Sequence, residues 1–125
     1  VEEKNTLADS IAVGKPRNWV KAVSAVKASK GNMINVSDED ILSMMRTAGR
    51  KTGVFAEPAG AAGLAGLKKA AADGIVKPSE TAAAVVTGNG LKDVDNGRKA
   101  AGNPIEVEAD IKKLTEIFAQ IGVKK

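Results

Sequence analysis

Cysteine and histidine are both missing from the sequence. Without cysteine the chain can form neither a disulfide bond nor a thiolate metal site, and without histidine it cannot contain a Ser-His-Asp triad. Its chemistry must therefore come from carboxylates, lysines, hydroxyl groups or a bound cofactor. A chain without cysteine also fits a reducing compartment, so we expect a cytoplasmic protein.

Aromatic residues make up only 2% of the sequence, and the large rings are Trp19, Phe55 and Phe118. The core must therefore be built from Ala, Val, Ile, Leu and Met. The net charge is +4, but basic residues are mixed with acidic ones and stacking aromatics are scarce, so we expect no nucleic-acid partner. No uninterrupted apolar run approaches the ~18 residues that a membrane span needs, and we expect no membrane partner.

Five segments have the spacing and the end signals of helices, and the length of 125 residues suits one domain. The clearest helix begins after Ser37, which has capping-box spacing to Asp40, and ends at Gly53. Asn18 is expected to cap the first helix and Asp110 the last. The predicted helices are residues 19–30, 38–52, 59–72, 94–101 and 111–121, and in the last of these Ile111, Leu114, Phe118 and Ile121 are expected to point inward.

Four short apolar segments between these helices are predicted to be strands or extended chain. They are residues 33–36, 54–56, 82–87 and 104–107. Because helices and short strands alternate, we predict an α/β fold with a short, mostly parallel sheet. Ligands bind beyond the carboxyl ends of the strands in such a sheet, which makes residues 56–60 and 87–90 a candidate site.

Glu57 and Thr87 are the polar side chains of interest at these two places. Glu57 is either a first-turn carboxylate favoured by the helix dipole or a carboxylate directed into a cleft. Thr87 is either a β-branched strand end or a hydroxyl that binds a ligand. Gly88, which follows it, lets backbone come close to a bound group. The residues by themselves leave both pairs of alternatives open.

Several of these segments resemble motifs of one enzyme family. Residues 87–93 (Thr-Gly-Asn-Gly-Leu-Lys-Asp) resemble the C-terminal signature of the threonine synthase family. Residues 57–61 (Glu-Pro-Ala-Gly-Ala) resemble an element shared by all fold-type-II, or tryptophan-synthase-β-like, pyridoxal-phosphate enzymes, threonine dehydratases included. Residues 10–16 and 104–110 are similar to a loop and a tail of that family. The order and spacing agree over nearly the whole chain, and residues 87–93 are the most specific part.

The resemblance implies a cofactor and roles for three residues. Pyridoxal 5'-phosphate would be bound with the Thr87 hydroxyl at its pyridine nitrogen and the Glu57 carboxylate near its ring, and Gly88 would let the loop pass close to the ring. The lysine that forms the Schiff base in this family, and the glycine-rich loop for the cofactor phosphate, are expected upstream of this chain. We therefore assign no catalytic lysine here, Lys92 included, and no metal.

The resemblance also implies an activity and partners. Residues 1–125 would be a single region, the C-terminal part of the large domain of a lyase that converts O-phospho-L-homoserine and water into L-threonine and phosphate. The expected partners are this small-molecule substrate, the remainder of the same enzyme and a second copy in a homodimer. Without the upstream lysine, this polypeptide is expected to be inactive.

Two other functions remain open from the sequence. One is a related fold-type-II enzyme with a different reaction, such as a cysteate synthase or a threonine dehydratase. The other is a free-standing, non-catalytic α/β interaction module.

Overall fold

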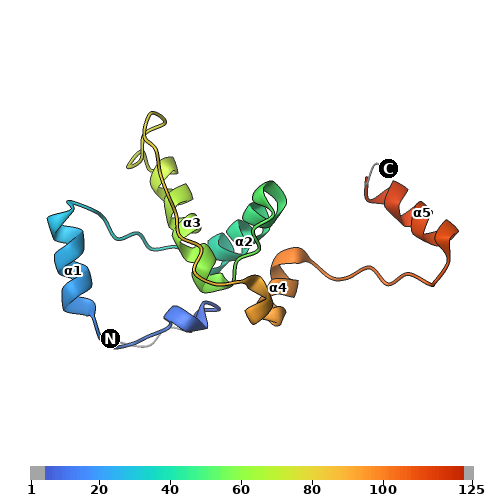
Figure 1. The fold of residues 1–125 in the computed structure, drawn as a ribbon, viewed down its shortest axis with the longest axis horizontal. Helices are drawn as coiled ribbons and strands as arrows, with labels where there is room; N and C mark the ends of the chain where they lie inside the picture. Colours follow the sequence, from blue (N-terminus) through green and yellow to red (C-terminus); the bar gives the residue numbers. More distant parts are fainter. Residues whose placement is uncertain (1–4, 123–125) are drawn as a thin grey trace.

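The computed structural model describes residues 5–122 of the chain. These residues form helices joined by turns and extended segments, in the order shown in Figure 1. The elements are η1 (Asp9–Ile11), α1 (Trp19–Ala28), α2 (Asp38–Thr52), α3 (Pro58–Ala72), η2 (Gly90–Lys92), α4 (Val94–Ala101) and α5 (Ile111–Gln120).

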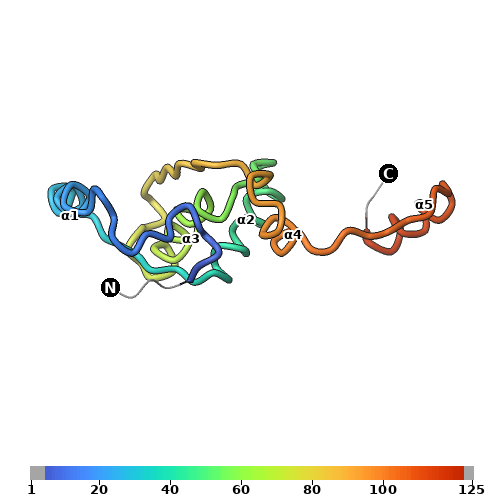
Figure 2. Tube along the Cα trace, turned by 90° about the horizontal axis from the view of Figure 1, so that it is seen from below, coloured from blue at the N-terminus to red at the C-terminus, as the bar shows by residue number. Residues whose placement is uncertain are grey.

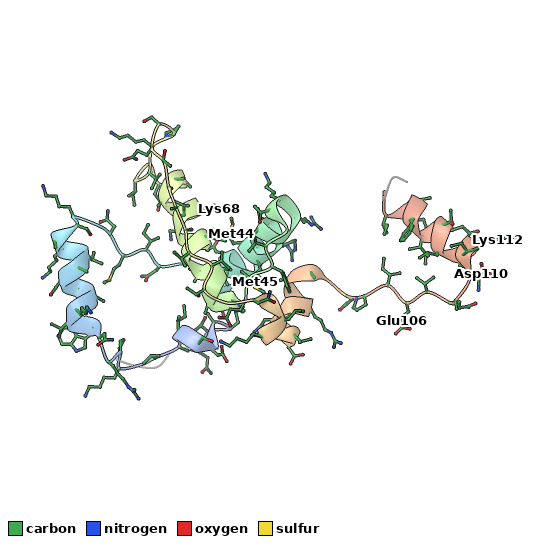
Figure 3. The ribbon with its side chains drawn as sticks, in the orientation of Figure 1. Met44, Met45, Lys68, Glu106, Asp110 and Lys112 are labelled. Carbon is green, nitrogen blue, oxygen red and sulfur yellow. The ribbon has the colours of Figure 1, made fainter. Side chains whose placement is uncertain are left out.

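The core lies where α2 and α3 pack together, with α4 and the N-terminal segment added at one end. Met45 is the only large side chain of residues 5–122 that is fully buried, and Figure 3 places it with Met44 where the two helices meet. Most other core residues are alanines, which allow the helix backbones to approach closely. The core cluster consists of Ala8, Ile41, Met45, Ala56, Ala61, Ala65 and Ala100.

Helix α2 begins and ends as its local chemistry predicts. The Ser37 side chain accepts a hydrogen bond from the Asp40 backbone N–H, and the Asp40 carboxylate accepts one from the Ser37 backbone N–H. This confirms the predicted capping box. Gly53 ends the helix in the left-handed region at φ 73°, a conformation that strongly favours glycine.

Polar contacts tie two further segments to α2. The Asp38 carboxylate accepts hydrogen bonds from the Thr6 hydroxyl (2.6 Å) and from the Leu7 backbone N–H (3.1 Å). Further along α2, the Arg46 Nε donates to the Ala100 carbonyl of α4 (2.7 Å). The segments that precede α1 and follow η2 are therefore anchored to the same helix.

Helices α1 and α5 lie away from this core, at opposite ends of the molecule in Figures 1 and 2. Neither helix has a buried residue. Asn18 stands at the N-cap of α1 as predicted, but its side chain makes no capping hydrogen bond, whereas Asp110 accepts from the Lys112 and Lys113 backbone N–H groups. The helix positions were therefore predictable, and only the second cap works as expected.

The inward-facing side of the last helix is a prediction that the structure corrects. Ile111 is 74% exposed, Phe118 43% and Ile121 52%, and Leu114 is half-buried. The apolar stripe is present, but in residues 5–122 no core residue lies under it. An amphipathic pattern fixes which side of a helix is apolar, whereas burial also requires a second element to cover it.

The predicted sheet is not formed within residues 5–122. Their only β pairing is one isolated antiparallel bridge between Ala56 and Asn89. The segments at 33–36, 82–87 and 104–107 run extended without a partner strand, and Met33 and Val85 in them are 65% and 80% exposed. A strand is defined by backbone hydrogen bonds to a neighbour, which this stretch of chain does not supply.

The helices among residues 5–122 lack the length and the apolar character that a bilayer crossing requires.

Candidate functional site

The two segments predicted to border a site do lie side by side. The backbone N–H of Glu57 donates to the Gly88 carbonyl (3.0 Å), and the N–H of Gly90 donates to the Phe55 carbonyl (2.8 Å). These two bonds flank the Ala56–Asn89 bridge. Residues 56–60 and 87–90 therefore meet through an antiparallel bridge, instead of at the shared edge of a parallel sheet.

Glu57 is the one charged side chain that is buried among residues 5–122. It occupies the N-cap position of α3, yet its side chain caps no backbone N–H group of that helix. Its Oε2 instead lies 3.0 Å from the Nζ of Lys92, with the two side chains 7% and 62% exposed respectively. Because a buried carboxylate needs a compensating partner, this ion pair accounts for its position.

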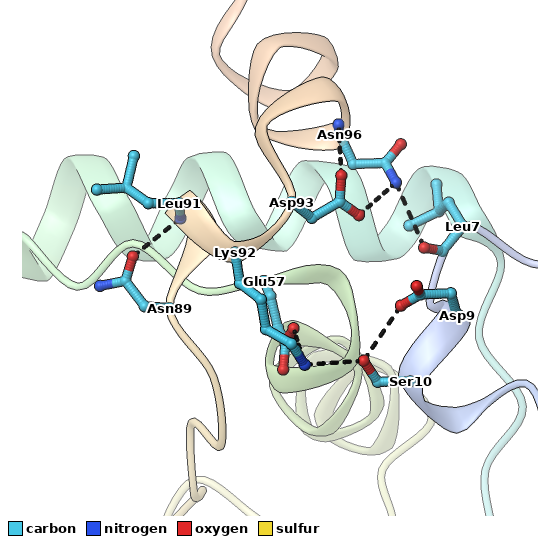
Figure 4. A network of polar contacts seen from close by, with 9 residues as sticks. All are labelled: Leu7, Asp9, Ser10, Glu57, Asn89, Leu91, Lys92, Asp93 and Asn96. Atoms are coloured by element: carbon cyan, nitrogen blue, oxygen red, sulfur yellow. Dashed lines mark hydrogen bonds and ion pairs between the residues drawn. The ribbon is translucent and has the colours of Figure 1, made fainter.

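The Lys92 ammonium also contacts a third segment, shown in Figure 4. Its Nζ donates a hydrogen bond to the Ser10 Oγ (3.1 Å), and the Ser10 hydroxyl donates to the Asp9 Oδ1 (3.1 Å). Ser10 begins the loop at residues 10–16 that the sequence marks as a motif. Three motif-bearing segments, distant in the sequence, thus converge on one ammonium group.

Asp93, which follows Lys92, forms the N-cap of α4. Its carboxylate accepts hydrogen bonds from the Asn96 side-chain amide (2.7 Å) and from the Asn96 backbone N–H (3.1 Å), which caps α4. The side-chain hydrogen bond, followed by the backbone one, lowers the pKa of Asp93 below its ordinary value of 3.8. The same amide lies 3.4 Å from the Leu7 carbonyl, so Asn96 also joins α4 to the N-terminal segment.

Two glycines allow the close approach of the motifs. A Cβ placed on Gly88 would lie 1.9 Å from the Glu57 Oε1, and one on Gly60 would lie 3.1 Å from the Gly88 backbone nitrogen. Both distances are shorter than ordinary van der Waals contact. In this structure the close neighbour of Gly88 is the Glu57 carboxylate, and the contact of Gly88 with a bound cofactor stays a prediction.

Thr87 is exposed and lies in a different pocket from Glu57. Among the hydrogen bonds of residues 5–122, none uses the Thr87 hydroxyl. Its pocket has a volume of about 330 Å³ and is lined by Gly53, Val54, Phe55, Val86, Thr87, Gly88 and Asn89. The Glu57 pocket, of about 320 Å³, is lined by Asp9, Glu57, Lys92, Asp93, Val94 and Asp95. Gly88 thus lies against the Glu57 carboxylate and also lines the pocket of Thr87, whereas Glu57 and Thr87 line different pockets.

Sequence reasoning missed the contact between Lys92 and Glu57. One signal was present: Glu57 stands between Ala56 and Pro58, at the start of a helix rich in Ala and Gly, where a carboxylate buried by its neighbours needs a cation. The sequence does not show which of its many lysines supplies that cation, because the partner lies beyond the whole of α3.

The amino-acid sequence also matches known proteins. A family profile described as pyridoxal-phosphate dependent enzyme matches residues 1–88, more than half of the chain. The chain belongs to this pyridoxal-phosphate dependent enzyme family. The matched residues include Glu57, Thr87 and Gly88, the three positions singled out as candidate cofactor ligands.

Individual members of the pyridoxal-phosphate dependent enzyme family are similar over most of the chain. A threonine synthase of Methanocaldococcus jannaschii is 39% identical over 116 residues, which cover 93% of this chain and 29% of that protein. One of Halalkalibacterium halodurans is 46% identical over 93 residues, 74% of this chain and 26% of that protein. One of Synechocystis is 41% identical over 120 residues, 96% of this chain and 30% of that protein. The chain therefore spans between a quarter and a third of the length of these relatives.

Proposed function

We propose that this chain is the C-terminal part of a threonine synthase, a lyase that uses pyridoxal 5'-phosphate to convert O-phospho-L-homoserine and water into L-threonine and phosphate. The observation that carries the proposal is the similarity to threonine synthases of Methanocaldococcus jannaschii, Halalkalibacterium halodurans and Synechocystis, at 39%, 46% and 41% identity. The resemblance of residues 87–93 to the signature of that family supports it.

The residues of this chain fit one side of a cofactor site. Pyridoxal phosphate, when bound, supplies an electron sink for carbanion chemistry. The Thr87 hydroxyl has no other partner among residues 5–122 and lines a pocket whose volume, about 330 Å³, lies in the range of small-molecule sites. A neutral hydroxyl suits the pyridine nitrogen without placing a charge beside it. In this proposal Thr87, Gly88 and Glu57 contact the cofactor.

The reactive lysine comes from another part of the enzyme. Lys92 is the one lysine in the cluster, and its ammonium already contacts the Glu57 carboxylate and the Ser10 hydroxyl. We therefore propose that residues 1–125 form a single C-terminal region that is inactive without the remainder of the enzyme.

The remainder of the enzyme also completes the sheet. The extended segments at 33–36 and 82–87 expose apolar side chains, including Met33 and Val85, and their backbone groups, which pair with no strand of residues 5–122, are suited to pair with other strands. In the proposed enzyme these segments are strands of a mostly parallel sheet, and two copies of the enzyme form a homodimer.

The test uses the whole open reading frame that contains this chain. The purified product is incubated with pyridoxal phosphate and O-phospho-L-homoserine, and threonine and phosphate are quantified. We expect equal amounts of both. Formation of cysteate and phosphate from O-phospho-L-serine and sulfite, or of 2-oxobutyrate and ammonia from threonine, in place of threonine formation would assign the chain to a different member of the family.

A second measurement tests the role of Thr87. We expect Thr87→Val to lose activity, because the methyl group that replaces the hydroxyl cannot form a hydrogen bond with the pyridine nitrogen. Thr87→Ser keeps the hydroxyl and should keep most of the activity. Equal activity of Thr87→Val and the wild-type enzyme would exclude Thr87 from the cofactor site.

A further inference from the structure

We propose that Lys92 is a positioning residue, which holds the Glu57 carboxylate at the cofactor site and joins it to the loop at residues 10–16 through Ser10. The proposal rests on the proposed function, because it assigns Lys92 an effect on a cofactor that Glu57 contacts. It concerns a contact within this chain, and its test includes readouts that do not depend on which substrate the enzyme uses.

The Glu57 carboxylate is confined from two sides. Its Oε2 is 3.0 Å from the Lys92 Nζ, and its Oε1 lies so close to Gly88 that a Cβ added there would be 1.9 Å from it. Gly88 and Lys92 belong to the same short segment, residues 87–93. One segment therefore contacts both oxygens of a carboxylate that stands on another element.

Lys92 compensates a charge that solvent reaches poorly. The Glu57 side chain is 7% exposed, so without Lys92 its buried negative charge would have no ion-pair partner. A carboxylate in that position would reorient toward water, which would change its distance from a bound cofactor.

The same ammonium contacts the loop motif. Lys92 Nζ donates to the Ser10 Oγ (3.1 Å), and the Ser10 hydroxyl donates to Asp9. Figure 4 shows these contacts as one connected chain from Asp9 to Glu57. The first residue of the loop at residues 10–16 and the Glu57 carboxylate are thus linked through one group.

A second ion pair in the chain provides a matched control. Lys113 on α5 pairs with Glu108, but both side chains are largely exposed, at 50% and 76%. Exposed pairs contribute little because water screens both charges. Lys113→Met makes the same chemical change as Lys92→Met at a site where no buried carboxylate is left behind.

The experiment uses the complete enzyme in five forms: wild type, Lys92→Met, Lys92→Arg, Glu57→Gln and the double variant Glu57→Gln/Lys92→Met. For each form, the dissociation constant of pyridoxal phosphate and the visible absorbance of the bound cofactor are measured, followed by kcat and KM for threonine formation. Lys113→Met is measured in parallel.

We expect Lys92→Met to shift the absorbance maximum of the bound cofactor and to lower kcat on the order of tenfold to a hundredfold, the loss that misplacing a catalytic contact produces. Lys92→Arg should restore most of the loss, because a guanidinium also pairs with a carboxylate. In the Glu57→Gln background, Lys92→Met should cause little further loss, because both residues act as one unit. Lys113→Met should match the wild type.

Two outcomes overturn the proposal. If Lys92→Met matches Lys113→Met in both cofactor absorbance and kcat, Lys92 has no positioning role. If the losses of Lys92→Met and Glu57→Gln multiply in the double variant, Lys92 acts independently of Glu57. The double variant leaves no unpaired buried charge, so it keeps the test decisive should Lys92→Met fail to fold.

Failure of the proposed function is distinguishable from failure of this inference. A wild-type enzyme that binds pyridoxal phosphate but forms no threonine would overturn the function. The cofactor affinities and absorbance spectra of the five forms would still decide whether Lys92 positions Glu57.

Discussion

Helices α2 and α5 have the same local design and different surroundings. Each begins at a residue whose side chain accepts hydrogen bonds from the first turn, and each has an apolar stripe. Helix α2 buries Ile41, Met45 and Ala48, whereas α5 buries no residue. The cap and the stripe are enough to specify a helix, but the free energy of burial depends on a partner that α3 supplies to α2 and that residues 5–122 do not supply to α5.

The largest effect that distinguishes these regions should come from truncating one apolar side chain in each. Met45→Ala removes a side chain that is 0% exposed, and we expect it to lower the free energy of unfolding by about 2–5 kcal/mol, because a buried cavity remains. Phe118→Ala, at a position 43% exposed, should change it by less than about 0.5 kcal/mol in the 125-residue chain. Urea unfolding followed by circular dichroism measures both.

The same pair of variants in the complete enzyme tests why α5 is uncovered. If the remainder of the enzyme packs on α5, Phe118→Ala should become destabilising there while Met45→Ala keeps its effect. An equally small effect of Phe118→Ala in both proteins would mean that α5 stays exposed in the complete enzyme.

The next largest difference is expected between two glycines of the same helix. Gly60 and Gly63 both lie on α3, but a Cβ on Gly60 would meet backbone atoms at 3.1–3.3 Å and one on Gly63 would meet nothing within 4 Å. Gly60→Ala should cost about 1–3 kcal/mol through overpacking, and Gly63→Ala should gain up to about 1 kcal/mol through helix propensity. Melting temperatures that move in the same direction for both variants would contradict this account of the packing.

A smaller difference should separate the two N-caps of α2 and α1. Ser37→Ala removes a capping box and should cost about 1 kcal/mol, whereas Asn18→Ala removes a side chain that makes no capping bond and should cost almost nothing. Chemical denaturation of each variant gives the two values. A cost for Asn18→Ala as large as that for Ser37→Ala would show that the α1 cap forms in solution.

The smallest predicted effect is the pH dependence contributed by Asp93. Hydrogen bonds from Asn96 lower its pKa in the folded chain below 3.8, so the unfolded chain binds this proton more tightly. The stability that Asp93 contributes is therefore complete above pH 3.8 and is lost as the pH falls through the lower, folded pKa. Asp93→Asn should remove this acid-dependent part, which unfolding experiments between neutral and acidic pH would detect as a flatter profile.

The sequence predicts features that depend on neighbouring residues, but not those that depend on residues far along the chain. Helix α2 begins after Ser37 and ends before Gly53, and α4 runs from Val94 to Ala101, both as predicted. Caps and helical periodicity are predictable because they depend on neighbouring residues. The predicted strands are not formed within residues 5–122, because an extended segment needs a neighbour to define it. Of their residues, Ala56 alone forms a β-bridge in this part of the chain, and that bridge is antiparallel.

The same distinction applies to the candidate site, where one contact was predictable and another was not. The adjacency of Glu57 and Gly88 followed from motifs at strand-like positions and is seen in the structure, although through a different pairing than predicted. The contact between Lys92 and Glu57 depends on how the chain returns after α3. It therefore could not be predicted without the three-dimensional positions of residues that are far apart in the sequence. Family resemblance supplied the role for Thr87, and its exposed hydroxyl could not have been chosen on physical grounds.

The bridge between Ala56 and Asn89 has a consequence for how this region can vary in length. It closes a loop that contains α3, the turn at residues 77–80 and the stretch at residues 81–86, so changes inside the loop do not alter the register of its two ends. The entropy of closing a loop grows only slowly with its length, and the turn at residues 77–80 is exposed. Insertions at that turn should therefore be tolerated and should leave the Glu57–Lys92 ion pair beside the bridge intact.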